Sequence, residues 1–254
     1  MDRALVSAIA HRRHPVAAPV SDESVHRLLT ELEPEMPSDA PRLLDLGCGS
    51  GEWLRGALRL LPAWEGVGVD VSAPALDEAR RRAGDDRGLR DRVRWERADA
   101  AAWSGGRFDV VICIGATHAF GGLAPTLEAL RRHLLPGGRV LLGEGYWEGT
   151  PSQAALDALG AAPGELPDLP GLMAEVARHG YEPGFGHLST AAEWDRYEWS
   201  WTGSLVTWAL EEADDDERTE ALGIAREHRR QWLEGYRGHL GFATVVLHDT
   251  GRGH

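Results

Sequence analysis

The sequence predicts an α/β fold, in which a mostly parallel sheet is flanked by helices on both faces. Two observations lead to this prediction. From Arg42 onward, short apolar segments alternate with segments of helical periodicity, and strands separated by helices imply right-handed crossovers and a parallel sheet. The apolar segments are also continuous rather than alternating in polarity, as expected for strands covered on both faces.

The first 40 residues are expected to form a helical cap and a linker ahead of the sheet. Ser21, followed by Glu23 and Ser24, has the character of an N-cap and predicts a helix that ends at about Leu32. Three prolines then mark the linker, at Pro34, Pro37 and Pro41.

Five strands and three helices are predicted in the next hundred residues. The strands are expected at Arg42–Leu46, Gly66–Val71, Val93–Arg97, Phe108–Ile114 and Arg139–Glu144. The helices between them are expected at about Glu52–Leu61, Ala73–Ala83 and Leu123–Leu135.

After residue 150 the alternation of predicted strands and helices becomes less regular. A helix at Leu169–His179 precedes a short strand near His187–Ser189, and a final strand is predicted at Phe242–His248. Between them lie two helices, Ala191–Leu210 and Asp214–Tyr236, the second with an acidic N-terminus that suits the helix dipole. We expect one domain over 1–254: a cap and linker at 1–40, a core at 41–150, and a C-terminal part at 151–254 whose helices at about 190–240 form a lid.

The charge balance argues against a nucleic-acid partner. The 254 residues carry a formal net charge of −13, and excess acid opposes binding to a phosphate backbone. All 27 basic residues are arginine. The chain therefore has no lysine for a Schiff base or for a phosphate-binding loop of the usual kind.

Other features favour a cytoplasmic protein without membrane contact. The two cysteines, Cys48 and Cys113, have neither metal-ligand nor redox spacing, and we expect no metal site, from His11 and His14 or elsewhere. The longest apolar runs, such as Val110–Ile114, are too short to span a bilayer. Residues 1–10 lack the apolar core of a signal peptide.

A glycine-rich turn after the first strand is the most informative segment. Residues 43–53 read Leu-Leu-Asp-Leu-Gly-Cys-Gly-Ser-Gly-Glu-Trp, so a buried strand runs into glycines and then into a helix. Ligands of such sheets bind outside the carboxyl ends of the strands, where glycines admit a ligand to the backbone and helix amides donate hydrogen bonds. The nicotinamide fingerprint is not met, because Glu52 occupies the place of its third glycine.

Four later segments complete a pattern. Asp70 ends the second predicted strand, and Asp99 ends the third strand. The fourth strand is formed by residues 108–114 (Phe-Asp-Val-Val-Ile-Cys-Ile). The turn into the fifth strand is formed by residues 134–141 (Leu-Leu-Pro-Gly-Gly-Arg-Val-Leu). With the glycine loop, this order resembles the class I methyltransferases that depend on S-adenosyl-L-methionine (SAM), of the bacterial small-molecule type. The resemblance covers about Leu43–Gly145. It implies a Rossmann-like, seven-stranded, mostly parallel sheet with a helical insertion before the last strand.

The resemblance also implies which residues bind SAM, whose product is S-adenosyl-L-homocysteine (SAH). Three groups are implied, at the methionine end, at the ribose and adenine, and beside the sulfonium. The methionine end is assigned Asp45, Gly47, Cys48, Gly49 and Gly51. The ribose and adenine are assigned Asp70, Val71, Asp99 and Ala100, and the sulfonium is assigned Ile114 and Gly115. Asp109 is implied to be a structural residue of the fourth strand.

The catalytic residues are expected just past the fourth and fifth strands, because the acceptor must be aligned with the methyl group there. His118 is the first candidate for a base, since the pKa of imidazole is close to neutral. Glu144 and Tyr146 follow the fifth strand and are candidates to bind or deprotonate the acceptor. A structural role remains an alternative for each of the three. The tryptophan-rich stretch from Trp194 to Trp208 forms either a cover for the acceptor or the core of the lid.

Three functions stay open at this point. The leading hypothesis is O- or N-methylation of a small molecule, such as an aromatic or natural-product metabolite, by a monomer or homodimer. The others are S- or halide methylation or other SAM chemistry, and a SAM-binding sensor or scaffold without turnover. No Asn/Asp-Pro-Pro-aromatic motif follows the fourth strand, and neither cysteine follows a proline. DNA, protein-amide and cytosine carbon-5 methylation therefore lose support.

Overall fold

The computed structural model describes residues 1–35 and 38–251, so Pro37 of the expected linker lies outside the described residues. The contacts divide the chain into two compact units. The sheet unit comprises Ser21–Glu144, Pro170–Leu188 and Ala243–His254, and the helical unit comprises Met1–Val20, Gly145–Leu169 and Ser189–Phe242.

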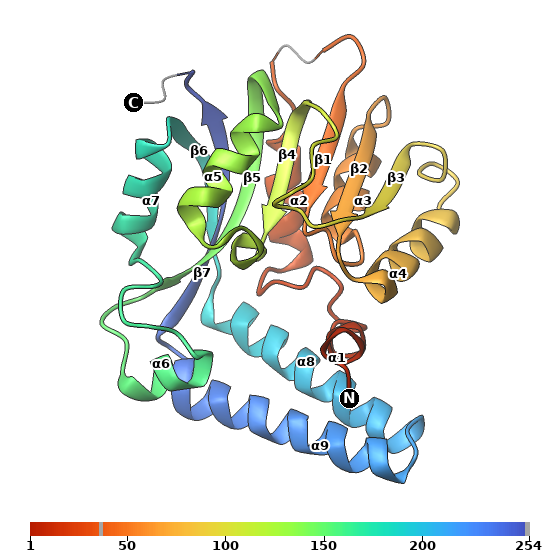
Figure 1. Ribbon diagram of the computed structural model, residues 1–254, viewed down its shortest axis with the longest axis vertical. Helices are drawn as coiled ribbons and strands as arrows, with labels where there is room; N and C mark the ends of the chain where they lie inside the picture. Colours follow the sequence, from red (N-terminus) through yellow and green to blue (C-terminus); the bar gives the residue numbers. More distant parts are fainter. Residues whose placement is uncertain (36–37, 252–254) are drawn as a thin grey trace. The chain divides into compact units, whose positions relative to one another are not determined.

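The described part of the chain forms one seven-stranded sheet in the order β3-β2-β1-β4-β5-β7-β6 (Figure 1). Neighbours from β3 to β5 run parallel, and β6 is antiparallel to β7. This confirms the predicted seven-stranded, mostly parallel sheet. The strands are β1 (Arg42–Leu46), β2 (Glu65–Asp70), β3 (Val93–Arg97), β4 (Phe108–Ile114), β5 (Leu134–Trp147), β6 (Tyr181–Leu188) and β7 (Leu240–Asp249).

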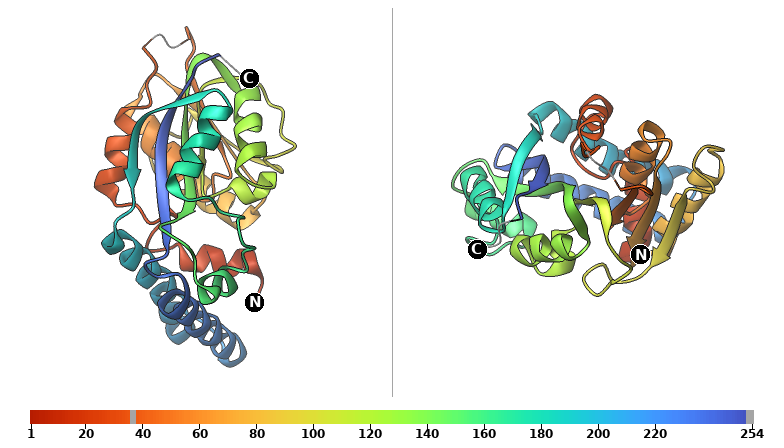
Figure 2. Two further views of the ribbon diagram at one scale, coloured as in Figure 1. Left: turned by 90° about the vertical axis from the view of Figure 1, so that its left-hand side faces the viewer. Right: turned by 90° about the horizontal axis from the view of Figure 1, so that it is seen from above.

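Helices cover both faces of the sheet, and the apolar strands are buried between them. Figure 2 shows α2 and α3 on one face and α5 and α7 on the other. The strand order reverses between β1 and β4, and the glycine loop follows β1 at this switch point, where sheets of this kind bind ligands. The helices of this unit are α2 (Asp22–Thr30), α3 (Glu52–Leu60), α4 (Ala73–Gly84), α5 (Leu123–Arg132) and α7 (Leu169–Arg178).

Asp109 on β4 fixes the chain that leads into the sheet. Its buried carboxylate accepts hydrogen bonds from the Ser38 amide at 2.7 Å, the Ser38 hydroxyl at 3.0 Å and the Arg42 amide at 2.9 Å. Three donors on one carboxylate satisfy most of its acceptor capacity. Asp109 therefore has the structural role that the sequence suggested.

The helical unit is built around α8 (Ala191–Glu211) and α9 (Asp215–Arg230), which follow β6 and precede β7 in the chain. This confirms the predicted helical insertion before the last strand. Thr190 and Glu193 form a capping box at the start of α8, and Asp214 caps α9. The remaining elements of this unit are α1 (Arg3–Ala10), α6 (Gln153–Leu159) and a π-helical turn, η2 (Gln231–Tyr236).

Several boundaries differ from the prediction. β5 begins at Leu134 and ends at Trp147, and β6 covers Tyr181–Leu188 rather than a short segment near His187–Ser189. Pro183 and two glycines conceal β6 in the sequence, because these residues are rare in strands, yet pairing with β7 holds it in place. The prediction also missed α6, and the expected helix to Tyr236 becomes π-helical at Gln231. None of the helices within the described residues is long and apolar enough to cross a bilayer.

Candidate active site

Three glycines shape the loop that follows β1. Gly47, Gly49 and Gly51 have φ angles of 76°, 52° and 74°, in the left-handed region that glycine adopts without a steric penalty. A Cβ on Gly47 would overlap the methyl group of Ala116, and one on Gly51 would overlap the ring of Trp95. Both the backbone angles and the space therefore require glycine at Gly47 and Gly51.

Trp95 supports this loop from β3 and was not predicted as a site residue. It faces Gly68 across the β2–β3 ladder, where a Cβ would lie 2.5 Å from its ring. The indole thus fills the space left by two glycines, Gly51 and Gly68. The alternation of β3 indicates only a half-buried tryptophan, and the strand register is needed to place it below the loop.

Asp45 lies on β1, two residues before Gly47, and is 2% exposed. Among the described residues its Oδ2 has no hydrogen-bond partner. Burial first, and the nearby carboxylate of Asp70 second, raise the pKa of Asp45 to about 8, while a hydrogen bond with the Leu54 backbone opposes them. A buried acceptor oxygen without a donor fits a ligand that brings a hydrogen-bond donor or a positive charge.

Asp70 ties the glycine loop to the end of β2. Its Oδ2 accepts the Gly49 amide at 2.8 Å, and its Oδ1 accepts the Ser72 amide at 2.8 Å. Each oxygen keeps a further lone pair, so both remain able to accept from a ligand. The neighbouring Val71 exposes 62% of its surface, an apolar surface beside the carboxylate.

Asp99 follows β3 and is exposed, with its Oδ1 accepting the Ala101 amide at 2.9 Å. Ala100 packs into the sheet core. A shallow hollow of about 380 Å³ opens beside Asp99, and Trp103 forms part of its wall. Trp103 was not predicted as a site residue, because the stretch after Asp99 has no periodicity that would orient its ring.

The predicted catalytic residues fall in both units. His118 lies exposed on a 3-10 turn, η1 (Thr117–Phe120), which follows Ile114 and Gly115 at the end of β4. Glu144 is 7% exposed on β5, in the same unit. Tyr146 belongs to the helical unit, where its ring covers Gly241 and its hydroxyl donates to Glu148 at 3.3 Å. Burial, and secondarily Glu148, raise the pKa of Tyr146.

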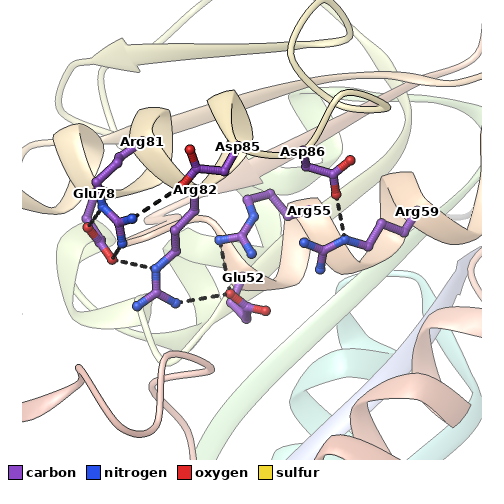
Figure 3. A network of polar contacts seen from close by, with 8 residues as sticks. All are labelled: Glu52, Arg55, Arg59, Glu78, Arg81, Arg82, Asp85 and Asp86. Atoms are coloured by element: carbon purple, nitrogen blue, oxygen red, sulfur yellow. Dashed lines mark hydrogen bonds and ion pairs between the residues drawn. The ribbon is translucent and has the colours of Figure 1, made fainter.

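Ion pairs fix the helix that begins after the loop (Figure 3). Glu52, the first residue of α3, lies 3.2 Å from the buried Arg55 and 3.5 Å from Arg82 on α4. Arg82 also contacts Glu78, whose pKa is lowered to about 2, chiefly by a hydrogen bond from Arg81. Glu52 therefore connects α3 to α4 from the position where a nicotinamide-binding loop has its third glycine.

Comparisons with known proteins agree with this geometry. Residues 44–140 match a family described as a methyltransferase domain. The SAM-dependent methyltransferase from Geobacter sulfurreducens, solved in complex with SAH, superimposes with a TM-score of 0.85 at 31% identity, over 97% of this chain and 98% of that one. YjhP of Escherichia coli (strain K12) is 32% identical over 227 residues, which cover 85% of this chain and 86% of YjhP.

A further relative matches about half of this chain. The 27-O-demethylrifamycin SV methyltransferase of Amycolatopsis mediterranei (strain S699) is 34% identical over 142 residues. The match covers 54% of this chain and 50% of that protein.

The Geobacter similarity extends over almost the whole of both chains, and it is accompanied by the loop and carboxylates described above. The chain belongs to the SAM-dependent methyltransferases. It is an enzyme whose cofactor is SAM.

Proposed function

We propose that this enzyme transfers the methyl group of SAM to an oxygen or nitrogen atom of a small molecule. The observation that carries the cofactor half of this proposal is the buried Oδ2 of Asp45, which has no hydrogen-bond partner among the described residues and lies on β1 just before a loop that requires glycine at Gly47 and Gly51. The rifamycin-type relative supports a small-molecule acceptor, because the region it shares with this chain belongs to an enzyme named for such a substrate.

The loop and the carboxylates fit SAM group by group. Asp45 accepts from the ammonium of the methionine end, and the amides of the loop Gly47–Gly51, with Cys48 acting through its backbone, surround that end. Asp70 accepts the ribose hydroxyls on the lone pairs that Gly49 and Ser72 leave free. The remaining contacts are assigned to Val71, Asp99 and Ala100 around the adenine, and to Ile114 and Gly115 beside the sulfonium.

SAM supplies an electrophilic methyl group, and the protein has to align the acceptor and take up its proton. His118 is the assigned base, because its imidazole is exposed and has no hydrogen-bond partner among the described residues. Glu144 is assigned to bind the acceptor. Tyr146 stays protonated because its pKa is raised, so it binds the acceptor rather than deprotonating it.

The test is an assay of the whole chain with SAM and separate panels of phenols, alcohols and amines, following SAH release and methylated product by mass spectrometry. We expect a methylated oxygen or nitrogen in at least one panel. Binding of SAH without product from any panel would overturn the proposal of small-molecule O- or N-methylation. Methylated thiols or halides in a parallel panel would assign the enzyme to the alternative chemistry.

A further inference from the structure

Two carboxylates of the sheet unit project from the same face of the sheet. Asp45 on β1 lies opposite Gly68 on the neighbouring strand β2 (Figure 1), and Asp70 follows Gly68 by two residues. Paired residues of adjacent strands share a face, and so do residues two apart on one strand. The two acids therefore share one environment, and the charge of each affects the other.

The two carboxylates differ in what stabilises a negative charge. Asp70 accepts the amides of Gly49 and Ser72, one on each oxygen and both at 2.8 Å. Asp45 is 2% exposed, and among the described residues its Oδ2 has no hydrogen-bond partner. A charge on Asp45 would lose its hydration, gain no donor at Oδ2 and lie beside a second carboxylate. The geometry therefore places the negative charge on Asp70 and a proton on Asp45.

Two thiols and two further charged groups complete the surroundings. Cys48, in the loop, and Cys113, on β4, both interact electrostatically with Asp45. Burial raises the pKa of each thiol, so both stay protonated and neutral. Beyond them, Arg80 on α4 acts on Cys48, and Glu144 on β5 acts on Cys113.

The charge balance at Asp45 itself is unfavourable to an anion. Among the described residues, Asp70 is the charged group that acts on Asp45, and it has the same sign. Burial first, and Asp70 second, raise the pKa of Asp45 to about 8, and a hydrogen bond with the Leu54 backbone offsets them only in part. At neutral pH the Asp45 carboxyl of the cofactor-free enzyme is therefore protonated. Only a positive charge brought to it would favour its ionised form.

The methionine end of the cofactor supplies that charge. An ammonium group has donors and no acceptor, so it pairs more strongly with an ionised carboxylate than with a neutral carboxyl group. The pair forms in full only when the proton of Asp45 leaves. Cys48 and Cys113 already hold their protons, so the proton passes to solvent.

We propose that cofactor binding is coupled to proton release: Asp45 is protonated in the cofactor-free enzyme and gives its proton to solvent when the ammonium of SAM or SAH binds. The O–H bond of Asp45 breaks, its electron pair stays on the carboxylate, and the ammonium takes the place of the proton. One positive charge enters the buried site as another leaves. The inference rests on the proposed function, which assigns Asp45 to the ammonium.

The coupling makes cofactor affinity depend on pH. Below the pKa of Asp45 the ammonium competes with a proton, so affinity rises with pH by up to about tenfold per pH unit. This dependence ends near pH 8, where Asp45 ionises without a ligand. A fall in pH correspondingly favours dissociation of SAH.

The test is calorimetry of SAH binding to the full chain at about pH 7, in phosphate and in Tris. These buffers take up protons with different heats, so the difference between the two measurements counts the protons released. We expect about one proton per SAH, and about tenfold weaker binding at pH 6 than at pH 7. 5′-Methylthioadenosine, which has the adenosyl group and the sulfur but no amino-acid end, should release no proton.

Two variants identify the source of the proton. Asp45→Asn replaces the carboxyl with a neutral group of the same shape, so SAH should bind without proton release and without the tenfold change between pH 6 and pH 7. Asp77→Asn changes an exposed carboxylate on α4. This matched control should release the proton as the wild type does.

Equal heats in the two buffers for the wild-type chain would overturn the inference. Equal proton release by SAH and 5′-methylthioadenosine would also overturn it, and so would release that persists in Asp45→Asn. If Asp45→Asn does not fold, the two ligands on the wild-type chain decide the question. No acceptor is present in these measurements. Proton release without methylation of any acceptor would therefore refute the proposed function alone, and methylation with equal heats would refute the coupling alone.

Discussion

The indole ring of Trp95 occupies the space that a side chain on Gly51 would need. The glycine loop is thus held from below by an aromatic ring on β3 as well as by its own backbone angles. Glycine is required at Gly51 both by its positive φ angle and by the nearby ring of Trp95. These two reasons can be separated experimentally.

Gly51→Ala should destabilise the protein more than Gly49→Ala. Both residues have positive φ angles, so each variant loses about 1–2 kcal/mol in a left-handed conformation. Only Gly51→Ala also displaces Trp95, which adds about 1–3 kcal/mol of overpacking, because the position of a Cβ on Gly49 is free of other atoms. Urea unfolding without SAM measures the difference. Equal losses would show that Trp95 moves aside at no cost.

Asp45 should make the protein less stable as the pH rises. Its pKa is about 8 in the folded chain and about 3.9 in an unfolded one. Between these values the folded state holds a proton that the unfolded state has lost, so the free energy of unfolding falls with rising pH, by up to about 1.4 kcal/mol per pH unit. Asp45→Asn should flatten this slope between about pH 5 and pH 8. An identical slope in the variant would mean that Asp45 is ionised throughout.

Asp70→Ala should weaken SAH binding by about 1–3 kcal/mol, the cost of removing a charged hydrogen-bond partner. The loss has two sources, because the ribose loses an acceptor and the amides of Gly49 and Ser72 lose theirs. Calorimetry with SAH gives the size of the effect. Asp77→Ala, which alters an exposed carboxylate on α4, should bind SAH as the wild type does.

His118→Ala should reduce turnover by a factor of about 10²–10⁴, as expected for the loss of a general base. SAH affinity should stay within a few-fold, because the imidazole is assigned to the acceptor and not to the cofactor. His26→Ala, at an exposed position on α2, controls for the loss of a surface histidine. Wild-type turnover in His118→Ala would transfer the role of base to another residue.

Asp109→Ala should lower stability by about 3 kcal/mol, because three donors of Ser38 and Arg42 lose a charged acceptor. Chemical unfolding measures the change, and Asp39→Ala at an exposed position nearby provides the reference. SAH affinity per folded molecule should be unchanged. A loss of affinity without a loss of stability would contradict the structural role.

The sequence predicted the parts of this molecule that local patterns determine. The continuous apolar runs of β1 and β4 and the glycines after β1 are local signals. Asp45 within β1 and Asp70 at the end of β2 are candidates that the strand pattern alone could name. β6 lacked such a signal, since Pro183 and its glycines are poor strand formers and only pairing with β7 orders them.

The contacts of Glu198 could not have been found in this way. Glu198 meets His228 and Tyr236 across 30 and 38 residues of chain, and each lies on a helix where a charged or aromatic residue is unremarkable. Trp95 is a similar case, because its role depends on the register that sets it opposite Gly68. Long-range packing, rather than composition, assigns these residues their roles.

The position of β7 affects how the protein is made. β7 lies between β5 and β6 in the sheet, yet its residues are translated after every helix of the insertion. Until Leu240–Asp249 leave the ribosome, β6 has no strand beside it and the outer edge of β5 stays open. Open strand edges favour aggregation. The nascent chain is therefore exposed to misassembly until β7 has been made, and a message cut short within the insertion yields a sheet that cannot close.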